Sequence, residues 1–328
     1  MKDGILNINK PEGWTSQDVC AKLRSRLHIK RIGHTGTLDP MATGVLPVCI
    51  GKATRIIEYY DEDFKTYHAS MKLGVTTDTL DIWGEVLQEK SVRIINKSEN
   101  SDAASINAEE NTAILIRTED ILKAFDDYTG TVSQIPPKYS ALKINGKRAY
   151  DLAREGKEFE IKSREITIAK NEITAIDNAA GTIDFDVTCS KGTYIRTICD
   201  DIGRTLGCGA AMTSLVRTKS GYFDIHDALD LADLLEMSDE EIGECIIPMD
   251  ETLLNLGIIE LNDNRFTAFI NGNTSGTGYK VLAESNFSIS SGKKTQNRKI
   301  YRVYNRECFL GTAFLDGREL VPAKVILR

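Results

Sequence analysis

The sequence lacks the usual features of secreted, membrane and metal-binding proteins. Its seven cysteines contain no CxxC pair and its four histidines no HxxxH pattern, so neither a zinc site nor a disulfide framework is indicated. The first residues are charged at Lys2 and Asp3 and have no apolar leader core. No apolar run approaches the roughly 18 to 20 residues that cross a bilayer. We therefore expect a cytoplasmic protein with reduced thiols and no membrane contact.

Nucleotide-binding loops are missing as well. The residues Gly292–Thr295 match the end of a phosphate-binding loop, but Phe287 stands where that motif needs its first glycine. No GxGxxG follows an expected strand. The sequence therefore predicts neither a cofactor nor a metal.

The chain length favours two domains. At 328 residues the chain is too long for one ordinary core and too short for three. Its 41% apolar and 27% charged residues are typical of folded globular proteins. We place the boundary near Ile247–Met249, which gives domains 1–250 and 251–328.

Charge of either sign is scarce in some segments and dense in others. Residues 220–264 hold thirteen acidic residues and no Lys or Arg, so the net charge of this segment is −13. The net charge of the whole chain is −7, so the rest of the chain carries +6. Cations are dense at 22–31 and at 293–306. Such asymmetry indicates contact with nucleic acid, although cationic runs are more often only solvated faces. We expect both cationic segments to contact nucleic-acid phosphates.

In the first part of the chain, short patterns predict strand, helix and loop in turn. Residues 4–9 are predicted to form a strand. The capping box of Thr15 and Asp18 predicts that a helix begins directly after Thr15. The mixture of Gly, Pro and Thr at 33–47 predicts a long structured loop. Strict alternation at 67–73 predicts a half-buried strand.

The middle of the chain has an acidic, apolar-poor stretch. Within residues 91–117, the stretch Lys97–Asn111 has too few large apolar groups to offset the entropy of ordering, so we expect 91–117 to be a mobile insertion. Helices are expected at 121–128 and after Gly146.

Further along, one strand leads directly into a helix. Residues 183–189 alternate as a strand, and the period then changes to that of a helix with Ile195, Ile198 and Ile202 inward. Gly207 is a natural helix stop. The acidic segment 224–245 is expected to be helical.

The C-terminal patterns and the mixture of elements set the fold class. Residues 299–304 and 308–315 read as short strands of a small β-rich domain. We expect an α/β (α+β) protein, with a mixed, largely antiparallel sheet flanked by helices and then a small β-barrel-like domain.

Asp39 is the most prominent candidate for chemistry. It lies in the Gly-rich segment 33–47, and the following Pro40 biases its backbone to an extended conformation. A carboxylate on a rigid loop can act as a nucleophile or a base. The alternative is an Asx turn, because Asp-Pro is a common turn pair.

Other candidates are weaker one by one. Arg196 is spaced to pair with Asp200 on an exposed helix face. Tyr67 fits a core tyrosine, and Leu215 a core leucine. His34 fits a loop residue, and Tyr194 fits a residue packed at a helix start.

All of these candidates except Leu215 lie in sequence blocks that resemble the bacterial tRNA pseudouridine synthase B family. The similarity runs in order from about Gly4 to Pro248, and the C-terminal part more loosely resembles the family's PUA-like RNA-binding domain. The family modifies uridine 55 in the T loop of tRNA. The matching blocks are Gly33–Pro47, Lys65–Tyr67, Leu73–Thr79, Ile135–Lys143 and Cys189–Ile198.

The resemblance implies a role for each candidate. Asp39 matches the family's nucleophile, which attacks the uridine so that the glycosidic bond breaks and C5 rejoins C1′; no cofactor is consumed. Arg196 matches the arginine that pairs with this aspartate. Tyr67 matches the aromatic residue that stacks on the base and is a candidate for removing the C5 proton. Tyr194 and Leu215 match positions lining the uracil pocket.

The resemblance also places His34 near displaced loop bases and implies tRNA as the partner, with no obligatory protein partner and a monomeric state. It leaves open whether Asp39 attacks C6 or C1′.

Three other functions stay open at this point. A retaining glycosidase would need a second carboxylate, and Asp78 and Asp81 are candidates. A non-catalytic RNA-binding or tRNA-folding module would use the basic surface alone. An RNA-guided synthase of the dyskerin type would depend on a guide RNA and partner proteins.

Overall fold

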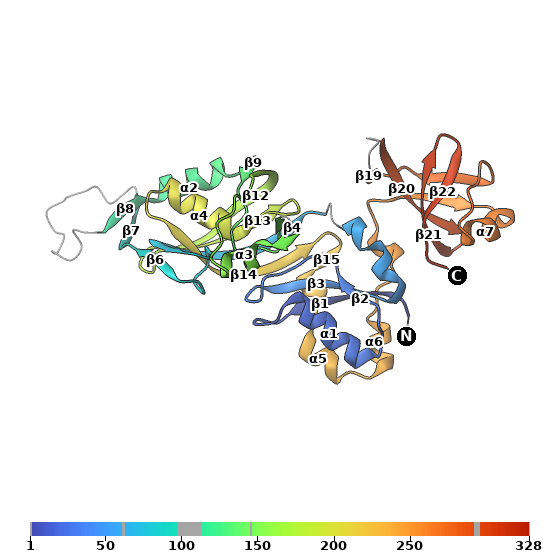
Figure 1. Cartoon of the computed structure of the whole chain (residues 1–328), viewed down its shortest axis with the longest axis horizontal. Helices are drawn as coiled ribbons and strands as arrows, with labels where there is room; N and C mark the ends of the chain where they lie inside the picture. Colours follow the sequence, from blue (N-terminus) through green and yellow to red (C-terminus); the bar gives the residue numbers. More distant parts are fainter. Residues whose placement is uncertain (1, 61–62, 97–112, 145, 292–295, 328) are drawn as a thin grey trace.

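The computed structural model describes residues 2–60, 63–96, 113–144, 146–291 and 296–327. Within these ranges one large sheet and one smaller C-terminal sheet dominate, with a narrower waist between them (Figure 1). Most of the described strand pairs are antiparallel, and four are parallel, two of them within the large sheet. The expected mixed, largely antiparallel architecture is therefore confirmed.

The large sheet has the order β16-β1-β3-β14-β4-β13-β12-β9, with β2 beside β3 and β15 beside β14. Its strands are β1 (Gly4–Lys10), β2 (Ile32–His34), β3 (Thr43–Ile50), β4 (Lys65–Leu73), β9 (Gly130–Gln134), β12 (Arg164–Asp177), β13 (Thr182–Cys189), β14 (Ala210–Ser220), β15 (Phe223–Asp224) and β16 (Leu229–Asp230).

Helices flank this sheet, and several of them lie where the sequence predicted them. In α1 (Ser16–Leu27) the Thr15 side chain accepts from the Asp18 N–H and Asp18 accepts from the Thr15 N–H, so the capping box is confirmed. The other helices of this lobe are α2 (Thr118–Asp127), α3 (Ala149–Arg154), α4 (Ile195–Thr205), α5 (Leu231–Glu236), α6 (Asp239–Glu244) and the 3-10 helix η1 (Gly51–Tyr60).

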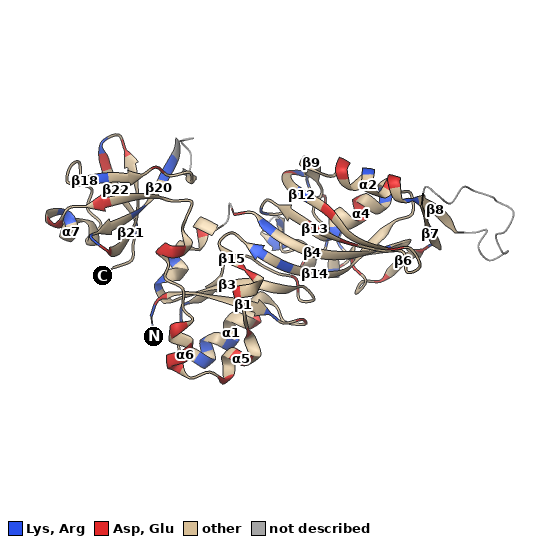
Figure 2. Ribbon diagram, turned by 180° about the vertical axis from the view of Figure 1, so that it is seen from behind, with Lys and Arg blue, Asp and Glu red and all other residues tan. Residues whose placement is uncertain are grey.

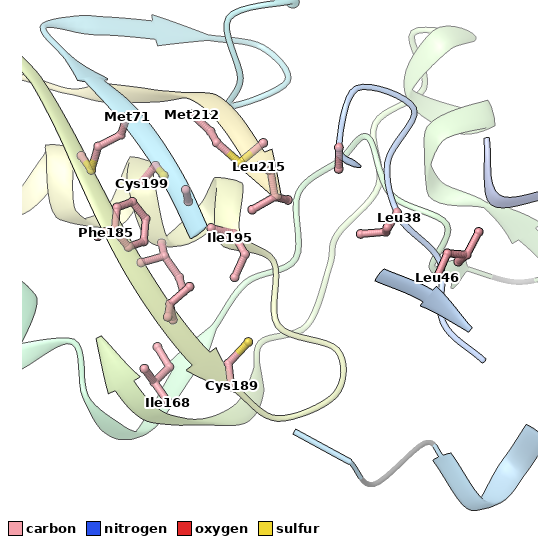
Figure 3. Packing of buried hydrophobic residues seen from close by; sticks show 14 of the residues in the cluster. Leu38, Leu46, Met71, Ile168, Phe185, Cys189, Ile195, Cys199, Met212 and Leu215 are labelled. Atoms are coloured by element: carbon pink, nitrogen blue, oxygen red, sulfur yellow. The ribbon is translucent and has the colours of Figure 1, made fainter. Parts of the chain in front are cut away.

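Strand β13 and helix α4, which follow each other directly, supply many of the core residues. The alternating residues of β13 and the inward residues of α4 are buried, with Phe185 and Ile195 among them. Phe125 of α2 meets Phe185 edge to face with ring centroids 5.1 Å apart. In Figure 3 Phe185, Ile195 and Leu215 lie on one side of the view, and Leu38 and Leu46 lie on the other, on the loop before β3 and on β3.

The expected loop at 33–47 is only partly a loop. Its start belongs to β2 and its end to β3, which is paired along its whole length with β1. The Thr35 N–H donates to the Pro47 carbonyl at 3.1 Å, so Pro47 presents its main-chain groups to the side away from β1. A proline can therefore stand inside this strand without costing a β1 ladder bond.

The segment 91–117 is ordered at both ends, contrary to expectation. Strands β7 (Val92–Ile95) and β8 (Ile114–Arg117) pair in parallel, and Ile94 and Ile116 are buried against the main core. These isoleucines at the two ends bury enough apolar surface to order the strands, and the polar composition of the middle of the segment does not show this. Residues 97–112 lie outside the described residues.

Two further strand pairs of this part of the chain form separate two-stranded sheets. They are β5 (Val75–Thr77) with β6 (Val86–Glu89), and β10 (Lys143–Ile144) with β11 (Lys147–Arg148).

The acidic segment 224–245 is not one helix. It begins with the end of β15, a 3-10 turn and β16, and only then forms α5 and α6. Met237 is extended between the helices, and Ser238 starts α6 with its own capping box. The strong N-cap signal of Ser238 therefore divided the helix that the apolar spacing favoured.

The C-terminal sheet has the order β18-β17-β20-β21-β22, with β19 beside β20. Its elements are β17 (Gly257–Leu261), α7 (Asp263–Ile270), β18 (Tyr279–Ala283), β19 (Ser288–Ser291), β20 (Gln296–Asn305), β21 (Cys308–Asp316) and β22 (Glu319–Val325).

The two lobes share an apolar cluster. Tyr59 of η1 hydrogen-bonds Thr312 of β21 at 2.7 Å, and its ring meets Phe287 edge to face. Ile300 and Ile326 of the C-terminal lobe belong to the same cluster. The packing therefore crosses the expected boundary near residue 250, and the division into 1–250 and 251–328 stays a prediction. None of the described helices is long and apolar enough to cross a membrane.

Candidate active site

Asp39 lies on a loop between β2 and β3 that is fixed on both sides of it. The main chain of Leu38 exchanges two hydrogen bonds with the buried Ser16 hydroxyl, at 2.9 and 3.3 Å. The Pro40 carbonyl accepts from the Lys10 ammonium and from the Gly13 N–H, both at 2.9 Å. The carboxylate itself is 44% exposed. A rigid loop thus presents an accessible carboxylate.

Lys10 is the buried anchor of this loop. Its ammonium group donates to three carbonyls, of Pro11, Trp14 and Pro40, at 2.6 to 2.9 Å. Burial lowers the pKa of Lys10 to about 8, and the negative charge of Asp39 is the largest opposing influence.

Arg196 contacts Asp39 directly. One guanidinium nitrogen lies 2.9 Å from an Asp39 carboxylate oxygen, and the other lies 3.5 Å from Asp81. The same guanidinium donates to the carbonyls of Thr79 at 2.9 Å and Tyr139 at 3.1 Å. Its side chain is only 6% exposed.

The surface pairing expected for Arg196 is therefore wrong. Asp200 pairs with Arg204 instead. A helical pattern places a residue off the apolar face of its own helix, but it cannot show that loops from elsewhere cover that position.

Tyr67 and Arg217 face each other across neighbouring strands β4 and β14, where they are register partners. Arg217 is 1% exposed and donates to the carbonyls of Val45 at 2.6 Å and Gly36 at 3.2 Å. It also hydrogen-bonds the Tyr67 side chain. Burial raises the pKa of Tyr67, and the Arg217 charge opposes that shift.

A cavity of about 410 Å³ brings most of the candidates together. Asp39, Tyr67, Tyr194, Arg196 and Leu215 all line it, which is five of the six candidate residues. Its size lies within the range of small-ligand pockets. The walls come from the Asp39 loop, the start of β4, the β13–α4 turn, the end of β14 and the Ala141–Leu142 loop.

His34 is the candidate that does not line this cavity. It lies at the end of β2, one residue before the lining segment begins at Thr35. Burial lowers its pKa, and the nearby Arg217 charge acts in the same direction. Its Nδ1 atom is buried and has no hydrogen-bond partner among the described residues.

Two buried cationic residues of the cavity were missed by sequence reasoning. Lys65, at the start of β4, is 8% exposed and its ammonium donates to the carbonyls of Tyr60 and Asp63. Arg217 is the second. One signal was available, because β alternation places Arg217 on the same side of its strand as Leu215.

The carboxylates proposed for a glycosidase do not join Asp39 in the cavity. Neither Asp78 nor Asp81 lines it. Asp81 is 14% exposed and accepts from the Thr79 hydroxyl and the Trp83 N–H, besides its contact with Arg196. This arrangement supports one accessible carboxylate held by a buried cation, which suits a nucleophile better than an acid/base pair.

The comparisons with known proteins agree with this geometry. The model described as "TruB family pseudouridylate synthase (N terminal domain)" matches residues 24–105 and 91–195, and the "tRNA pseudouridylate synthase B C-terminal domain" model matches 196–254.

Similar curated proteins named tRNA pseudouridine synthase B cover nearly the whole chain. The protein from Clostridium kluyveri is 41% identical over 92% of this chain and 91% of its own length. The protein from Clostridium acetobutylicum is 42% identical over 96% of both chains. The chain belongs to the TruB family of pseudouridylate synthases. It is a pseudouridine synthase, and the family resemblance of the sequence is confirmed.

Solved structures show the same fold. A Cbf5-Nop10-Gar1 complex matches with a TM-score of 0.71 and 23% identity, covering 99% of this chain and 85% of that chain. An H/ACA RNP bound to a substrate RNA containing 2′-deoxyuridine matches with a TM-score of 0.70 and 21% identity over the same shares.

Proposed function

We propose that the protein converts the uridine at position 55 in the T loop of tRNA into pseudouridine, with Asp39 as the nucleophile. The observation that carries this proposal is the 2.9 Å contact between Arg196 and Asp39 at the edge of the shared cavity. The names of the curated relatives support tRNA as the substrate.

In this proposal Asp39 attacks C6 or C1′ of a uridine that has left its base stack, and the bond between N1 and C1′ breaks. The uracil turns, C5 bonds to C1′ and the bond to Asp39 breaks, which frees the carboxylate, and the proton on C5 is lost while N1 gains one. Atoms balance within the substrate, so no group is transferred to a cofactor. Arg196 keeps the carboxylate in place and balances its charge.

Tyr67 serves as the flat surface for the flipped base. An aromatic ring suits a base that has lost its stacking partners. Burial holds the Tyr67 phenol protonated, so removal of the C5 proton by Tyr67 would need the phenolate that Arg217 favours. Tyr194 and Leu215 complete the walls around the base. We place His34 behind this wall, toward bases displaced from the T loop.

The RNA phosphates would meet only part of the cationic segments. In α1, Arg26 pairs with Asp239 of α6 at 2.7 Å and Arg24 donates to the Ile32 carbonyl, so both already have partners. Figure 2 shows the basic residues of α1 beside the acidic residues of α5 and α6. Lys22, Lys30 and Arg31 are exposed and remain our candidates for phosphate contacts.

In the segment 293–306, Arg302 donates to the Asp250 carbonyl at 2.8 Å and Arg306 pairs with Asp263 at 2.6 Å. Lys299 pairs with Glu284 at 3.3 Å. These partners weaken the expectation that this segment binds RNA. Lys293 and Lys294 lie outside the described residues.

The proposed partner is tRNA alone, bound by a monomer in the cytoplasm. The neighbouring Cbf5 structures contain protein partners, so a partner-dependent synthase is the alternative. Purified protein acting on a tRNA transcript without guide RNA or other proteins would decide in favour of the independent enzyme.

The experiment measures modification and binding side by side. Wild type, Asp39→Asn and Asp39→Ala are incubated with an unmodified tRNA transcript, with EDTA and no cofactor. We expect pseudouridine with the wild type only and nearly equal tRNA affinity for all three, since phosphate contacts dominate affinity. Binding without modification by the wild type would favour the non-catalytic RNA-binding module.

A further inference from the structure

Gln134 and Arg164 face each other at one end of the large sheet, and both reach the turn before α4. They are register partners on the neighbouring strands β9 and β12. Neither residue lines the cavity, whereas the turn at 190–194 lines it throughout. The pair therefore lies directly behind one wall of the site.

Gln134 holds the main chain of Tyr194 by two hydrogen bonds. Its side chain is fully buried, its Oε1 accepts from the Tyr194 N–H at 2.8 Å, and its Nε2 donates to the Tyr194 carbonyl at 3.1 Å. The amide thus pairs with both main-chain groups of one residue, as a neighbouring strand would.

Arg164 holds the other side of the same turn. Its guanidinium donates to the Gly192 carbonyl and lies 5.0 Å from the centre of the Tyr194 ring. Gly192 has φ +78°, and a Cβ there would lie 3.1 Å from the guanidinium carbon. The guanidinium therefore packs closely on the glycine backbone as well as on the tyrosine ring.

The turn connects this pair to the chemistry. Tyr194 is the N-cap of α4, has no side-chain cap of its own, and its carbonyl accepts from the N–H groups of Thr197 and Ile198. Arg196 is the second residue of that helix. A shift of the Tyr194 main chain would therefore move both the wall of the cavity and the guanidinium that contacts Asp39.

We propose that Gln134 and Arg164 are positioning residues for the reaction, which hold the β13–α4 turn so that Tyr194 and Arg196 face the target base and Asp39. The inference rests on the proposed function, and it adds two residues outside the cavity to the set that determines the rate.

The test uses variants that remove the contacts with little change of size. Gln134→Met removes both hydrogen bonds, Gln134→Glu keeps an acceptor for the Tyr194 N–H but loses the donor, and Arg164→Lys loses the flat guanidinium. A matched control is Asn171→Leu, because Asn171 is also a buried amide, lies on β12, and donates to the carbonyls of Phe125 and Tyr128 away from the cavity.

The measured quantities are the single-turnover rate of pseudouridine formation, the Kd for the tRNA transcript, and Tm. For Gln134→Met we expect the rate to fall about 10- to 100-fold, as misplacement by about 1 Å can do. The rate of Gln134→Glu should lie between those of the wild type and Gln134→Met, and the rate of Arg164→Lys should also be lower than that of the wild type. The Kd should stay within about twofold, because the phosphate contacts are unchanged. Asn171→Leu should lower Tm without lowering the rate of the folded protein.

Equal rates for Gln134→Met and Asn171→Leu, measured well below both Tm values, would overturn the inference. Hydrogen exchange of residues 190–197 gives a readout that does not need activity. We expect faster exchange there in Gln134→Met than in the wild type and in Asn171→Leu; unchanged exchange would also overturn the inference. If the wild type itself fails to modify tRNA, the proposed function has failed, and the exchange result still decides whether the pair holds the turn.

Discussion

Replacing Arg196 with methionine removes the cation that Asp39 and Asp81 share while keeping much of the volume of the side chain. In the native structure the guanidinium contacts Asp39 at 2.9 Å and Asp81 at 3.5 Å, and it is 6% exposed. The variant therefore leaves two carboxylates near each other without the guanidinium that contacts both. We expect Asp39 to lose its fixed position.

The magnitude follows from the contacts. A hydrogen bond to a charged group contributes about 1.5 to 3 kcal/mol, and because Asp39 is 44% exposed we take the lower end, about 1.5 kcal/mol. That value corresponds to about a tenfold change in rate. Misplacement of the carboxylate should add about another tenfold. We expect the single-turnover rate of Arg196→Met to fall by about 100-fold.

Asp81→Asn is the matched comparison. It removes the charge at the more distant contact and keeps an oxygen that can accept from the Thr79 hydroxyl. We expect a loss of about tenfold or less, since the contact with Asp39 persists. Combining it with Arg196→Met should cost little more than Arg196→Met alone, because both changes act through one guanidinium.

Single-turnover kinetics on a tRNA transcript, with tRNA affinity measured separately, check this reasoning. Near-wild-type rates for Arg196→Met would refute it. So would a larger loss for Asp81→Asn than for Arg196→Met, because Asp81 rather than Asp39 would then be the important partner.

Three further predictions concern the surroundings of the cavity. Arg217→Met should lower stability by about 2 to 4 kcal/mol, because two carbonyls lose a buried donor, and denaturant unfolding measures the loss. Gly44→Ala should lower Tm strongly, because the added Cβ would lie 2.3 Å from the Arg217 carbonyl oxygen. Gly13 also has a positive φ but has open space around it, so Gly13→Ala should lower Tm less. Burial raises the pKa of Asp63, so the native state binds its proton more tightly than the unfolded state and the ionised carboxylate lowers stability at neutral pH. Asp63→Asn should therefore raise Tm at pH 7, and the gain should vanish near pH 3, where Asp63 is protonated in both states; an equal gain at both pH values would contradict this assignment.

Local signals in the sequence were reliable where one short pattern determines one element. The Thr15 capping box and the change of period after Cys189 each predicted a helix that the structure contains. Both signals depend on neighbouring residues only. They needed no knowledge of the rest of the fold.

Two errors arose where distant segments decide the outcome. Pro47 sits in a strand because its main-chain groups point away from β1, and that direction depends on the pairing of three strands. Arg196 is buried because loops carrying Asp39, Thr79 and Tyr139 close over it. No spacing along α4 contains this information.

The cationic lining of the site was missed for the same reason. Lys65 and Arg217 lie on otherwise apolar strand faces, so their positions point inward, but their charged side chains are of a type that is mostly exposed. They can be buried because main-chain carbonyls accept hydrogen bonds from their side chains. Resemblance to a family identified Asp39 and its partner, and only the structure added the cations around them.

The most direct test of the central claim maps the modified nucleotide. Wild type and Asp39→Asn are each incubated with an unmodified tRNA transcript and with the same transcript carrying cytidine at the T-loop target, and pseudouridine is located at single-nucleotide resolution. The account predicts one pseudouridine, at T-loop position 55, only with the wild type and only in the uridine transcript. Modification by Asp39→Asn at the wild-type rate, or modification elsewhere while the T-loop uridine stays unchanged, would contradict it.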